Sequence, residues 1–335
     1  MLIREILEKR EHEILSEYAA FSDQTEGRDR EETPCEIRPA FQRDRDRILY
    51  SKSFRRLKDK TQVFLTPHGD HYRTRMTHSL EVAQNARTIV RALRLNEDLA
   101  EAIALGHDLG HTPFGHAGER ALRSVCPLGF AHHEQSLRIV ERLEKLGKGL
   151  NLTKEVRDGI LNHEMDLTPA TLEGKVVRLS DKIAYIHHDV EDAVRGGILT
   201  MEDIPSDITE VLGRTSDDWF DTIFNDIIRE STGKNDIVMD DGVYDAIMRL
   251  RSFMFERVYT NPLAKSEEGK AIEMIKTLYA YYLSHIDAFP PYLKAMIDEG
   301  EPKERIVCDY ISGMTDHFAI TRYTELFIPK SWSVY

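Results

Sequence analysis

Cysteine is scarce in this sequence. Only three of its 335 residues are cysteines (Cys35, Cys126 and Cys308), and no two of them form a C-x-x-C pair. Small extracellular domains held together by disulfides carry a denser and even-numbered set, so this class of protein is excluded. A reducing cytoplasm is the compartment that we expect.

Long apolar runs are missing as well. No stretch approaches the roughly 20 apolar residues that span a bilayer. The first fifteen residues, MLIREILEKREHEIL, are charged from the start and lack the apolar core of a signal peptide. Hydrophobic residues make up 41% and charged residues 31%, which is too apolar for a disordered chain. We therefore expect a soluble cytoplasmic protein without a membrane partner.

An excess of positive charge is also absent, because the formal net charge is −13. A broad nucleic-acid footprint would need a basic face. Residues 38–60 are the exception, with nine Arg or Lys against three Asp. Two interpretations stay open for this segment. It is a solvated helix face, or it is a local anion site that suits a small polyphosphate and binds single-stranded DNA only weakly.

Alternating β-type patterns are rare, and Thr61 to Leu65 is the single short candidate. Apolar residues instead recur at three- and four-residue steps, which predicts helices. The predicted helices cover about 78–93, 97–108, 133–146 and 176–194, with further helices from residue 206 onward. Asn96 is the N-cap that we expect for the second of them. The expected fold is all-α. We interpret residues 1–60 as an N-terminal arm with the basic segment, 61–195 as a catalytic bundle, and 196–335 as a C-terminal helical region packing on that core.

The most informative segment is 107–119, HDLGHTPFGHAGE, which holds three histidines, an aspartate and a glutamate around a Gly-Pro turn. Such a concentration of reactive groups at a helix end is hard to explain by packing. His107 and Asp108 are adjacent at the end of one predicted helix. His78 begins the preceding helix, and Asp181 lies on a later one. Two imidazoles and two carboxylates suit Mn²⁺, Mg²⁺, Fe²⁺, Ni²⁺ or Zn²⁺, so ligand type alone does not name the metal.

Two further patterns accompany this set. Asp181, Tyr185 and Asp189 are spaced i, i+4, i+8 and therefore share one helix face. That face either contacts a sugar and base or is a solvated stripe. The sequence His132-His133-Glu134-Gln135 is read either as an acid–base pair or as simple complementation of a helix dipole.

The ordered set His78, His107-Asp108 and Asp181 resembles the H…HD…D signature of the HD phosphohydrolase superfamily. Longer blocks are similar to the deoxyguanosine triphosphate triphosphohydrolase family. These blocks are FQRDRDRI at 41–48, FRRL at 54–57, KTQVF at 60–64, RMTHSLEVAQ at 75–84, GHDLGHTPFGHAGE at 106–119 and DYISGMTD at 309–316. The resemblance runs from about residue 18 to the end, and blocks of this length do not arise by chance.

This resemblance implies an HD-domain helical bundle with additional C-terminal helices, which hydrolyses a deoxynucleoside triphosphate (dNTP) to a deoxynucleoside and inorganic triphosphate. It also implies one divalent metal ion per active site. The metal ligands that it implies are His78, His107, Asp108 and Asp181. The catalytic residues that it implies are His111, His116, Glu119, His133 and Glu134. One of the histidines would protonate the departing 5′ oxygen, and which one does so stays open.

The resemblance further implies how substrate is held. Arg75 and Lys182 would bind phosphate oxygens, and Gln62 and Asp189 would contact the 3′-hydroxyl. Tyr185 would pack where a ribose 2′-hydroxyl would clash, which gives a steric reason for preferring deoxyribose. A looser alignment matches Arg251 to a γ-phosphate arginine and Tyr259 to a tyrosine that stacks on the base. Relatives often form homo-oligomers and some bind a nucleotide activator, and both are expectations here.

Two other functions share the same signature. One is an HD-type phosphodiesterase that acts on a cyclic nucleotide, an alarmone or a nucleic-acid end. The other is a nucleotide or single-strand nucleic-acid sensor that uses the same pocket without catalysis. The complete set of metal ligands and the additional histidines favour an enzyme. Acidity of the whole chain disfavours nucleic acid as the main substrate.

Overall fold

The protein is all-α. The computed structural model describes residues 1–62, 73–164, 166–259 and 267–330. Within these ranges the chain forms helices and two isolated antiparallel bridges, Arg28–Thr153 and Thr61–Thr74, and it forms no strand. The short β candidate at 61–65 is thus represented by a single bridge at Thr61, and its last three residues lie outside the described ranges. No helix among the described residues is both long and apolar enough to cross a membrane.

The chain divides into two compact units, each assembled from three segments. The first unit comprises residues 1–50, 78–107 and 151–265, and the second comprises residues 51–77, 108–150 and 266–335. Both units therefore cross the arm, bundle and C-terminal region interpreted from the sequence, and that division stays an interpretation.

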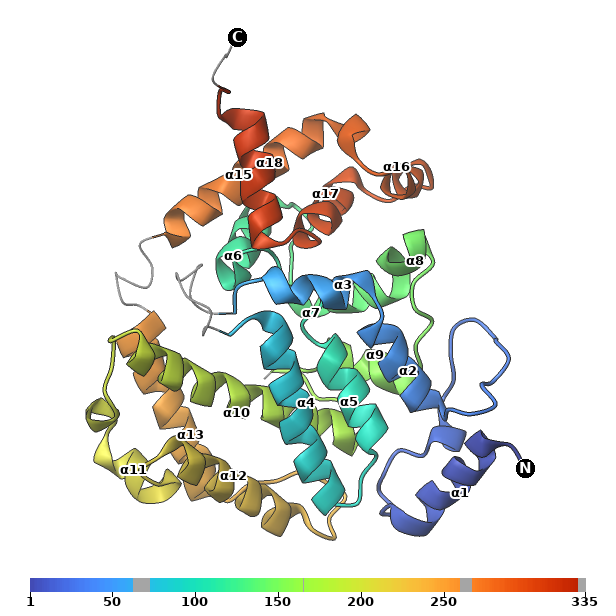
Figure 1. Cartoon of the computed structure of the whole chain (residues 1–335), viewed down its shortest axis with the longest axis vertical. Coiled ribbons are helices and arrows are strands. Elements are labelled where there is room, and N and C mark those ends of the chain that lie inside the picture. Colours follow the sequence, from blue (N-terminus) through green and yellow to red (C-terminus); the bar gives the residue numbers. More distant parts are fainter. Residues whose placement is uncertain (63–72, 165, 260–266, 331–335) are drawn as a thin grey trace, which may run out of the picture. The chain divides into compact units, whose positions relative to one another are not determined.

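Figure 1 shows the helices in chain order. The first unit holds α1 (Ile3–Ile14), η1 (Ser22–Gln24), α2 (Ala40–Leu49), most of α4 (Arg75–Ala92), α5 (Glu97–Gly106), α9 (Lys154–Leu161), α10 (Leu172–Arg195), η4 (Met201–Asp203), α11 (Ser206–Leu212), α12 (Ser216–Ser231), α13 (Asp241–Met254) and η5 (Phe255–Tyr259). The second unit holds α3 (Lys52–Arg56), η2 (Leu57–Asp59), α6 (Gly115–Val125), α7 (His132–Arg138), η3 (Ile139–Leu143), α8 (Glu144–Gly147), α15 (Glu268–Ser284), η6 (Ile286–Ala288), α16 (Pro291–Asp298), α17 (Lys303–Ser312) and α18 (Asp316–Phe327).

Helix α5 is the central element of the first unit and packs against α2, α9 and α10. It begins where the Asn96 side chain accepts a hydrogen bond from the backbone N–H of Leu99 at 3.2 Å, as the sequence predicts for this N-cap. All residues from Ala102 to Gly106 are buried, because neighbouring helices cover α5 on several sides. Gly159 of α9 allows one close approach: a Cβ there would lie 2.4 Å from Ile103 Cδ1. The buried C-terminal end of α5 delivers His107 to the interior.

Helices α6, α15, α16, α17 and α18 surround the apolar core of the second unit. Its fully buried side chains include Leu122, Leu278, Leu293, Ile306 and Ala319. Helix α6 packs along α15, and α17 also contacts α15. The C-terminal helices therefore supply most of the core on which α6 rests, and the first turns of α6 carry His116 and Glu119 of the histidine-rich segment.

Helices α4 and α10 begin three and four residues before the predicted 78 and 176, and two further differences concern the site. Helix α5 ends at Gly106, so His107 and Asp108 lie in the turn after it. The helix predicted over 133–146 is interrupted: α7 passes into the π-helix η3, and Lys145 and Leu146 then take left-handed backbone conformations. Apolar periodicity persists through this break, which is why the sequence does not reveal it.

Candidate active site

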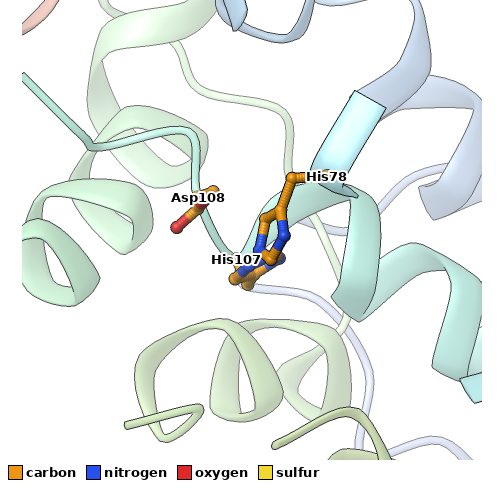
Figure 2. A group of neighbouring side chains, drawn as sticks. All are labelled: His78, His107 and Asp108. Carbon is orange, nitrogen blue, oxygen red and sulfur yellow. The ribbon is translucent and has the colours of Figure 1, made fainter. Parts of the chain in front are cut away.

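Three of the four predicted metal ligands converge inside the first unit. His78 Nε2 lies 2.9 Å from Asp181 Oδ1, and His107 Nε2 lies 3.6 Å from the same oxygen. The two imidazole rings have centroids 5.7 Å apart. Figure 2 shows both rings side by side, together with Asp108, the residue after His107. Helices α4 and α10 and the end of α5 each contribute one ligand, which fixes the geometry of the group.

Hydrogen bonding sets the tautomer of His107. Its Nδ1 lies 2.7 Å from the carbonyl oxygen of Ala104, and because a carbonyl only accepts, Nδ1 must be the donor. In the neutral ring this leaves the lone pair of Nε2 directed toward Asp181. A lone pair facing a carboxylate oxygen at 3.6 Å is favourable only with a proton or a cation between them. The residues present therefore fit a divalent metal ion.

Asp181 is ionised in this arrangement. Burial by itself raises the pKa of its carboxyl group, but hydrogen bonds with His107 and His78 and their charges outweigh burial and hold the pKa well below its usual value. The Asp181 side chain keeps 27% of its surface exposed, whereas the side chains of His78 and His107 keep 1% each. The carboxylate thus lies where both the buried rings and a ligand from solvent can reach it.

Asp108 is the first residue of the second unit, joined to His107 by a peptide bond. Its carboxylate accepts a hydrogen bond from Arg75 Nη1 at 2.7 Å and lies 3.1 Å from His111 Nε2. The side chains of Arg75 and Asp108 are 2% and 5% exposed. A buried arginine beside this carboxylate offers positive charge for a phosphate while it fixes the carboxylate in place.

His111 is buried in a stack of imidazoles. Its ring lies against that of His132 with centroids 3.9 Å apart and an interplanar angle of 17°. Burial, together with the positive charges of Arg75 and His132, lowers the pKa of His111 well below the usual value for histidine, and Asp108 only partly offsets this effect. His111 is therefore neutral at physiological pH and suited to accept or share a hydrogen bond.

Glu119 joins two more histidines. Its carboxylate lies 3.4 Å from His116 Nδ1 and 3.2 Å from His132 Nδ1, and it accepts a hydrogen bond from the backbone N–H of His132. Burial raises the pKa of Glu119, but its hydrogen bonds with the two rings lower it far more, so the carboxylate is ionised. The His116 side chain is 57% exposed, whereas that of His132 is 7% exposed. His116 is thus the accessible ring that an ionised carboxylate orients.

A strained loop carries His111 and leads into α6, the helix that carries His116 and Glu119. Phe114, the residue before α6, has φ 63° and ψ 25°, which is the left-handed region that non-glycine residues avoid, and Gly115 follows with φ 53°. The backbone N–H of Phe114 donates to Asp316 Oδ1 at 2.9 Å, and the Thr112 hydroxyl donates to the Gly115 carbonyl at 2.8 Å. Fixed bonds on both sides hold the loop from His111 to Gly115 in this conformation.

Lys60 is buried against the same loop, with 3% of its surface exposed. Its ammonium donates to the carbonyl of His111 at 2.5 Å and to the carbonyl of Ser312 at 2.7 Å. Burial, joined by the charges of Arg56 and Arg75, lowers the pKa of Lys60 to about 7. The sequence placed Lys60 in a basic segment, and nothing in its pattern indicated a buried lysine.

Four of the nine basic residues of segment 38–60 lie in the first unit, and all four pair with carboxylates there. Arg38 pairs with Asp46, Arg45 with Asp98, and Arg47 with Glu32. Because these charges are largely offset, the segment presents less free positive charge than its composition indicates. The anion-site interpretation of this segment stays a prediction.

The predicted substrate-contacting residues fall in both units. Lys182 in the first unit is 7% exposed and lies 4.9 Å from the centroid of the Tyr244 ring, and burial with the charges of Arg251 and Arg178 lowers its pKa to about 8. Asp189 is buried and Arg251 is exposed. The side chains of Tyr185 and Tyr259 lie outside the described residues.

Gln62 and Arg75 belong to the second unit. The Gln62 side-chain oxygen is buried and, among the described residues, has no hydrogen-bond partner. The Gln62 main-chain carbonyl accepts a bond from Arg75 Nη2 at 3.3 Å. A buried acceptor of this kind is a group that a ligand hydroxyl can satisfy.

The sequence assigned His133 and Glu134 to the histidine network, but the contacts with Glu119 are made by His132. His133 contacts the His132 ring edge-on at a centroid distance of 5.9 Å, and Glu134 is exposed. His132 is the first residue of α7, and that helix sets the direction of its side chain. The sequence pattern does not show which of the two adjacent histidines points toward Glu119.

Two further histidines were missed or taken as structural. His163 lies edge-on to His107 with ring centroids 5.0 Å apart. His188 lies edge-on to His78 at 6.1 Å, and its Nδ1 lies 3.2 Å from Glu81. The one available signal was position: His188 is seven residues after Asp181 and therefore returns to nearly the same face of α10.

Comparison with known proteins shows the family of this chain. Residues 75–186 match the HD domain family, and residues 237–325 match the phosphohydrolase-associated domain family. A deoxyguanosinetriphosphate triphosphohydrolase-like protein of Caldanaerobacter subterraneus is 55% identical over 99% of this chain and 98% of its own length. The chain belongs to the deoxyguanosinetriphosphate triphosphohydrolase-like family of HD-domain phosphohydrolases.

Other relatives extend the same family. A protein of that name from Desulfatibacillum aliphaticivorans is 49% identical over 98% of this chain and 99% of its own length. Among solved structures, a phosphohydrolase from Bacteroides thetaiotaomicron superposes with a TM-score of 0.51 at 18% identity, over 84% of this chain and 69% of that chain. This last likeness concerns the fold alone. The family resemblance and the all-α fold expected from the sequence are thereby confirmed.

Proposed function

We propose that this protein hydrolyses dNTPs to a deoxynucleoside and inorganic triphosphate, with one divalent metal ion per active site. The observation that carries the proposal is the continuity of the donor set. His78, His107 and Asp181 converge in the first unit, and the residue after His107 is Asp108, which is held by Arg75 and His111. The peptide bond between His107 and Asp108 thus joins the proposed metal ligands of the first unit to the proposed acid–base residues of the second.

His78, His107, Asp108 and Asp181 would hold the metal, which when bound acidifies water and polarises a phosphate oxygen. Four protein ligands would leave the metal able to take further ligands from solvent or substrate. The ligand types are compatible with Mn²⁺, Mg²⁺, Fe²⁺, Ni²⁺ or Zn²⁺. The tautomer of His107, fixed by the Ala104 carbonyl, keeps Nε2 available for this role.

The reaction that we propose is attack of a water oxygen on the α-phosphorus. A bond forms between that oxygen and phosphorus, and the bond from phosphorus to the 5′ oxygen breaks. The 5′ oxygen leaves as a hydroxyl after taking a proton, and the triphosphate departs with the attacking oxygen. His116 is the proton donor that we favour, because its ring is exposed and faces the ionised carboxylate of Glu119. The buried, neutral His111 would position a phosphate oxygen beside Arg75.

Names of the relatives support a deoxyguanosine triphosphate or another dNTP as the substrate. In this chain the unsatisfied Gln62 oxygen is an acceptor for a sugar hydroxyl, and Lys182 is a buried cation for a phosphate oxygen. Tyr185, Asp189, Arg251 and Tyr259 complete the substrate-contacting set that we propose. Homo-oligomer formation, a nucleotide activator, weak single-stranded DNA binding and a cytoplasmic location also stay proposals.

The test is to incubate the purified protein with each dNTP and each rNTP in Mn²⁺ or Mg²⁺, and to separate the products by ion-exchange chromatography. We expect deoxynucleoside and triphosphate in equal amounts, with rNTPs left intact. If single dNTPs are not hydrolysed, mixtures of dNTPs test for an activator. Monophosphate products would overturn the proposal in favour of the phosphodiesterase, and binding without any product would favour the sensor.

A further inference from the structure

The C-terminal segment 309–316, DYISGMTD, lies far in sequence from the histidines. Inside the second unit, however, Asp316 contacts the loop 111–115 directly, and Ser312 is joined to it through Lys60. The Ser312 carbonyl accepts from Lys60 Nζ, which also donates to the His111 carbonyl. The Asp316 carboxylate accepts from the Phe114 N–H at 2.9 Å, from the Thr61 N–H at 2.9 Å and from the Thr61 hydroxyl. Asp316 directly, and Ser312 through Lys60, therefore tie this segment to the two ends of the loop.

A buried lysine at position 60 is energetically unfavourable if its role is only to stabilise the fold. Its ammonium is buried on two neutral carbonyl oxygens, and burying a charge in this way is less favourable than filling the same volume with an apolar side chain. The contacts of Lys60 instead fix the positions of main-chain atoms in neighbouring segments. Its ammonium fixes the His111 carbonyl, and its own carbonyl accepts from the Arg75 N–H at 3.2 Å. One residue thus sets the main-chain position of both His111 and Arg75.

Asp316 compensates for strain. Phe114 is held in the left-handed region, a conformation that persists only where surrounding contacts determine it. The Asp316 carboxylate supplies such a contact by accepting from the Phe114 N–H, and its side chain is buried at the start of α18. Without this acceptor the loop would lose the bond that keeps Phe114 and Gly115 left-handed.

We propose that Lys60 and Asp316 are positioning residues that hold the loop 111–115, and with it His111, in the geometry needed for catalysis. The proposal rests on the proposed function for its catalytic reading. It gives the C-terminal region a part in positioning His111 within the second unit. Neither residue touches substrate in this proposal; both act through the loop.

Lys60→Met and Asp316→Asn test the proposal, with Glu144→Gln as the matched control. Glu144 is also a buried carboxylate of the second unit, and it accepts from the N–H and hydroxyl of Ser53 much as Asp316 accepts from Thr61. We expect kcat for dNTP hydrolysis to fall at least thirtyfold in the first two variants, with KM changed less than threefold. Glu144→Gln should keep both constants within threefold of the wild type.

A second measurement does not depend on activity. Hydrogen–deuterium exchange of the peptide covering residues 111–116, followed by mass spectrometry, should be at least tenfold faster in Asp316→Asn and Lys60→Met and unchanged in Glu144→Gln. Thermal unfolding identifies any variant that fails to fold. If kcat survives in both variants, or if all three variants lose activity together, the positioning proposal is wrong.

Failure of the proposed function gives a different result. A wild-type protein without dNTP hydrolysis, tested with single and mixed nucleotides, would overturn that function and leave the loop to be judged by exchange alone. Faster exchange confined to residues 111–116 in the two variants would then still support positioning. Unchanged exchange would overturn it.

Discussion

Individual side chains in this protein have protonation states that their surroundings dictate. Two imidazoles keep Asp181 ionised and two others keep Glu119 ionised, whereas burial, together with the charge of Arg75, keeps His111 neutral. At Glu173 the surroundings act in the opposite direction. Burial raises the pKa of its carboxyl group, and no cation among the described residues offsets this effect. Each of these states has a consequence that a single substitution measures.

Asp181→Asn should abolish metal binding. The amide keeps the shape of the carboxylate but loses the negative charge that faces the His78 and His107 rings. We expect the affinity for Mn²⁺ to fall by about 100-fold or more, measured by isothermal titration calorimetry. Asp192→Asn, on the same helix α10, is the control and should bind Mn²⁺ as the wild type does. Unchanged affinity in Asp181→Asn would rule out this ligand.

Glu173→Gln should change how stability depends on pH. Burial raises the pKa of Glu173 from 4.5 to about 7, although its carboxylate accepts from the N–H groups of Ala20 and Asn96. The folded state therefore holds this proton more tightly than the unfolded state. Its stabilising contribution is complete below about pH 4.5 and is lost as pH rises through about 7.

Glutamine keeps the acceptor for both N–H groups and never ionises. At pH 8 we expect Glu173→Gln to be more stable than the wild type by about 2–3 kcal/mol, and at pH 4.5 to differ little. Urea unfolding across this pH range measures the difference. Glu155→Gln, a partly buried carboxylate that accepts from Thr25 and Glu26, is the control. A wild type and Glu173→Gln with parallel pH profiles would contradict the prediction.

Some elements of this fold approach one another closely at positions where one of them carries a glycine. A Cβ on Gly110 would lie 2.2 Å from the Ser136 nitrogen and 2.3 Å from the His132 carbonyl oxygen, both main-chain atoms of α7. The turn that carries the HD pair is thus packed directly on the helix that carries His132. By contrast, no atom lies within 4 Å of a Cβ placed on Gly269 of α15.

Gly110→Ala and Gly269→Ala should therefore have opposite effects. Main-chain atoms cannot move aside as a flexible side chain can, so we expect Gly110→Ala to cost about 2–3 kcal/mol and to displace His132 from His111. Gly269→Ala should be neutral or stabilise the protein by up to about 1 kcal/mol. Thermal unfolding of both variants measures the pair. Equal stability in the two would show that α7 does not pack on Gly110 as described.

At the scale of the whole molecule, the units are built from interleaved segments. Each unit is assembled from three separate segments, and the HD pair spans a point where the chain passes from one unit to the other. Ligands from α4, α5 and α10 are far apart in the unfolded chain, so a metal that binds them binds the folded state alone. Metal binding and folding are consequently linked.

Mn²⁺ should therefore raise the midpoint of thermal unfolding of protein that was first treated with a chelator. At a free concentration of 100 times Kd, the stabilisation is about 2.7 kcal/mol. Asp181→Asn should show no such rise, since it lacks one of the converging ligands. Differential scanning fluorimetry measures both. An equal rise in wild type and Asp181→Asn would indicate that the metal stabilises the fold from another site.

The sequence by itself determined the fold class and the family, and it predicted the residues that we propose as metal ligands. These follow from local information: helical periodicity, the spacing of His78, His107-Asp108 and Asp181, and residue blocks long enough to carry a resemblance. Helix α5 with its Asn96 N-cap was predicted almost to the residue, because capping is a matter of adjacent residues.

Tertiary structure decided the rest. Which of two adjacent histidines meets Glu119, why Lys60 is buried rather than part of a basic surface, and how Asp316 reaches Phe114 all depend on contacts between distant segments. The interleaving of the two units has the same origin. The burial of a side chain and the partners that it contacts determine its protonation state and its position. Both are properties of the folded chain, and spacing along a sequence does not specify them.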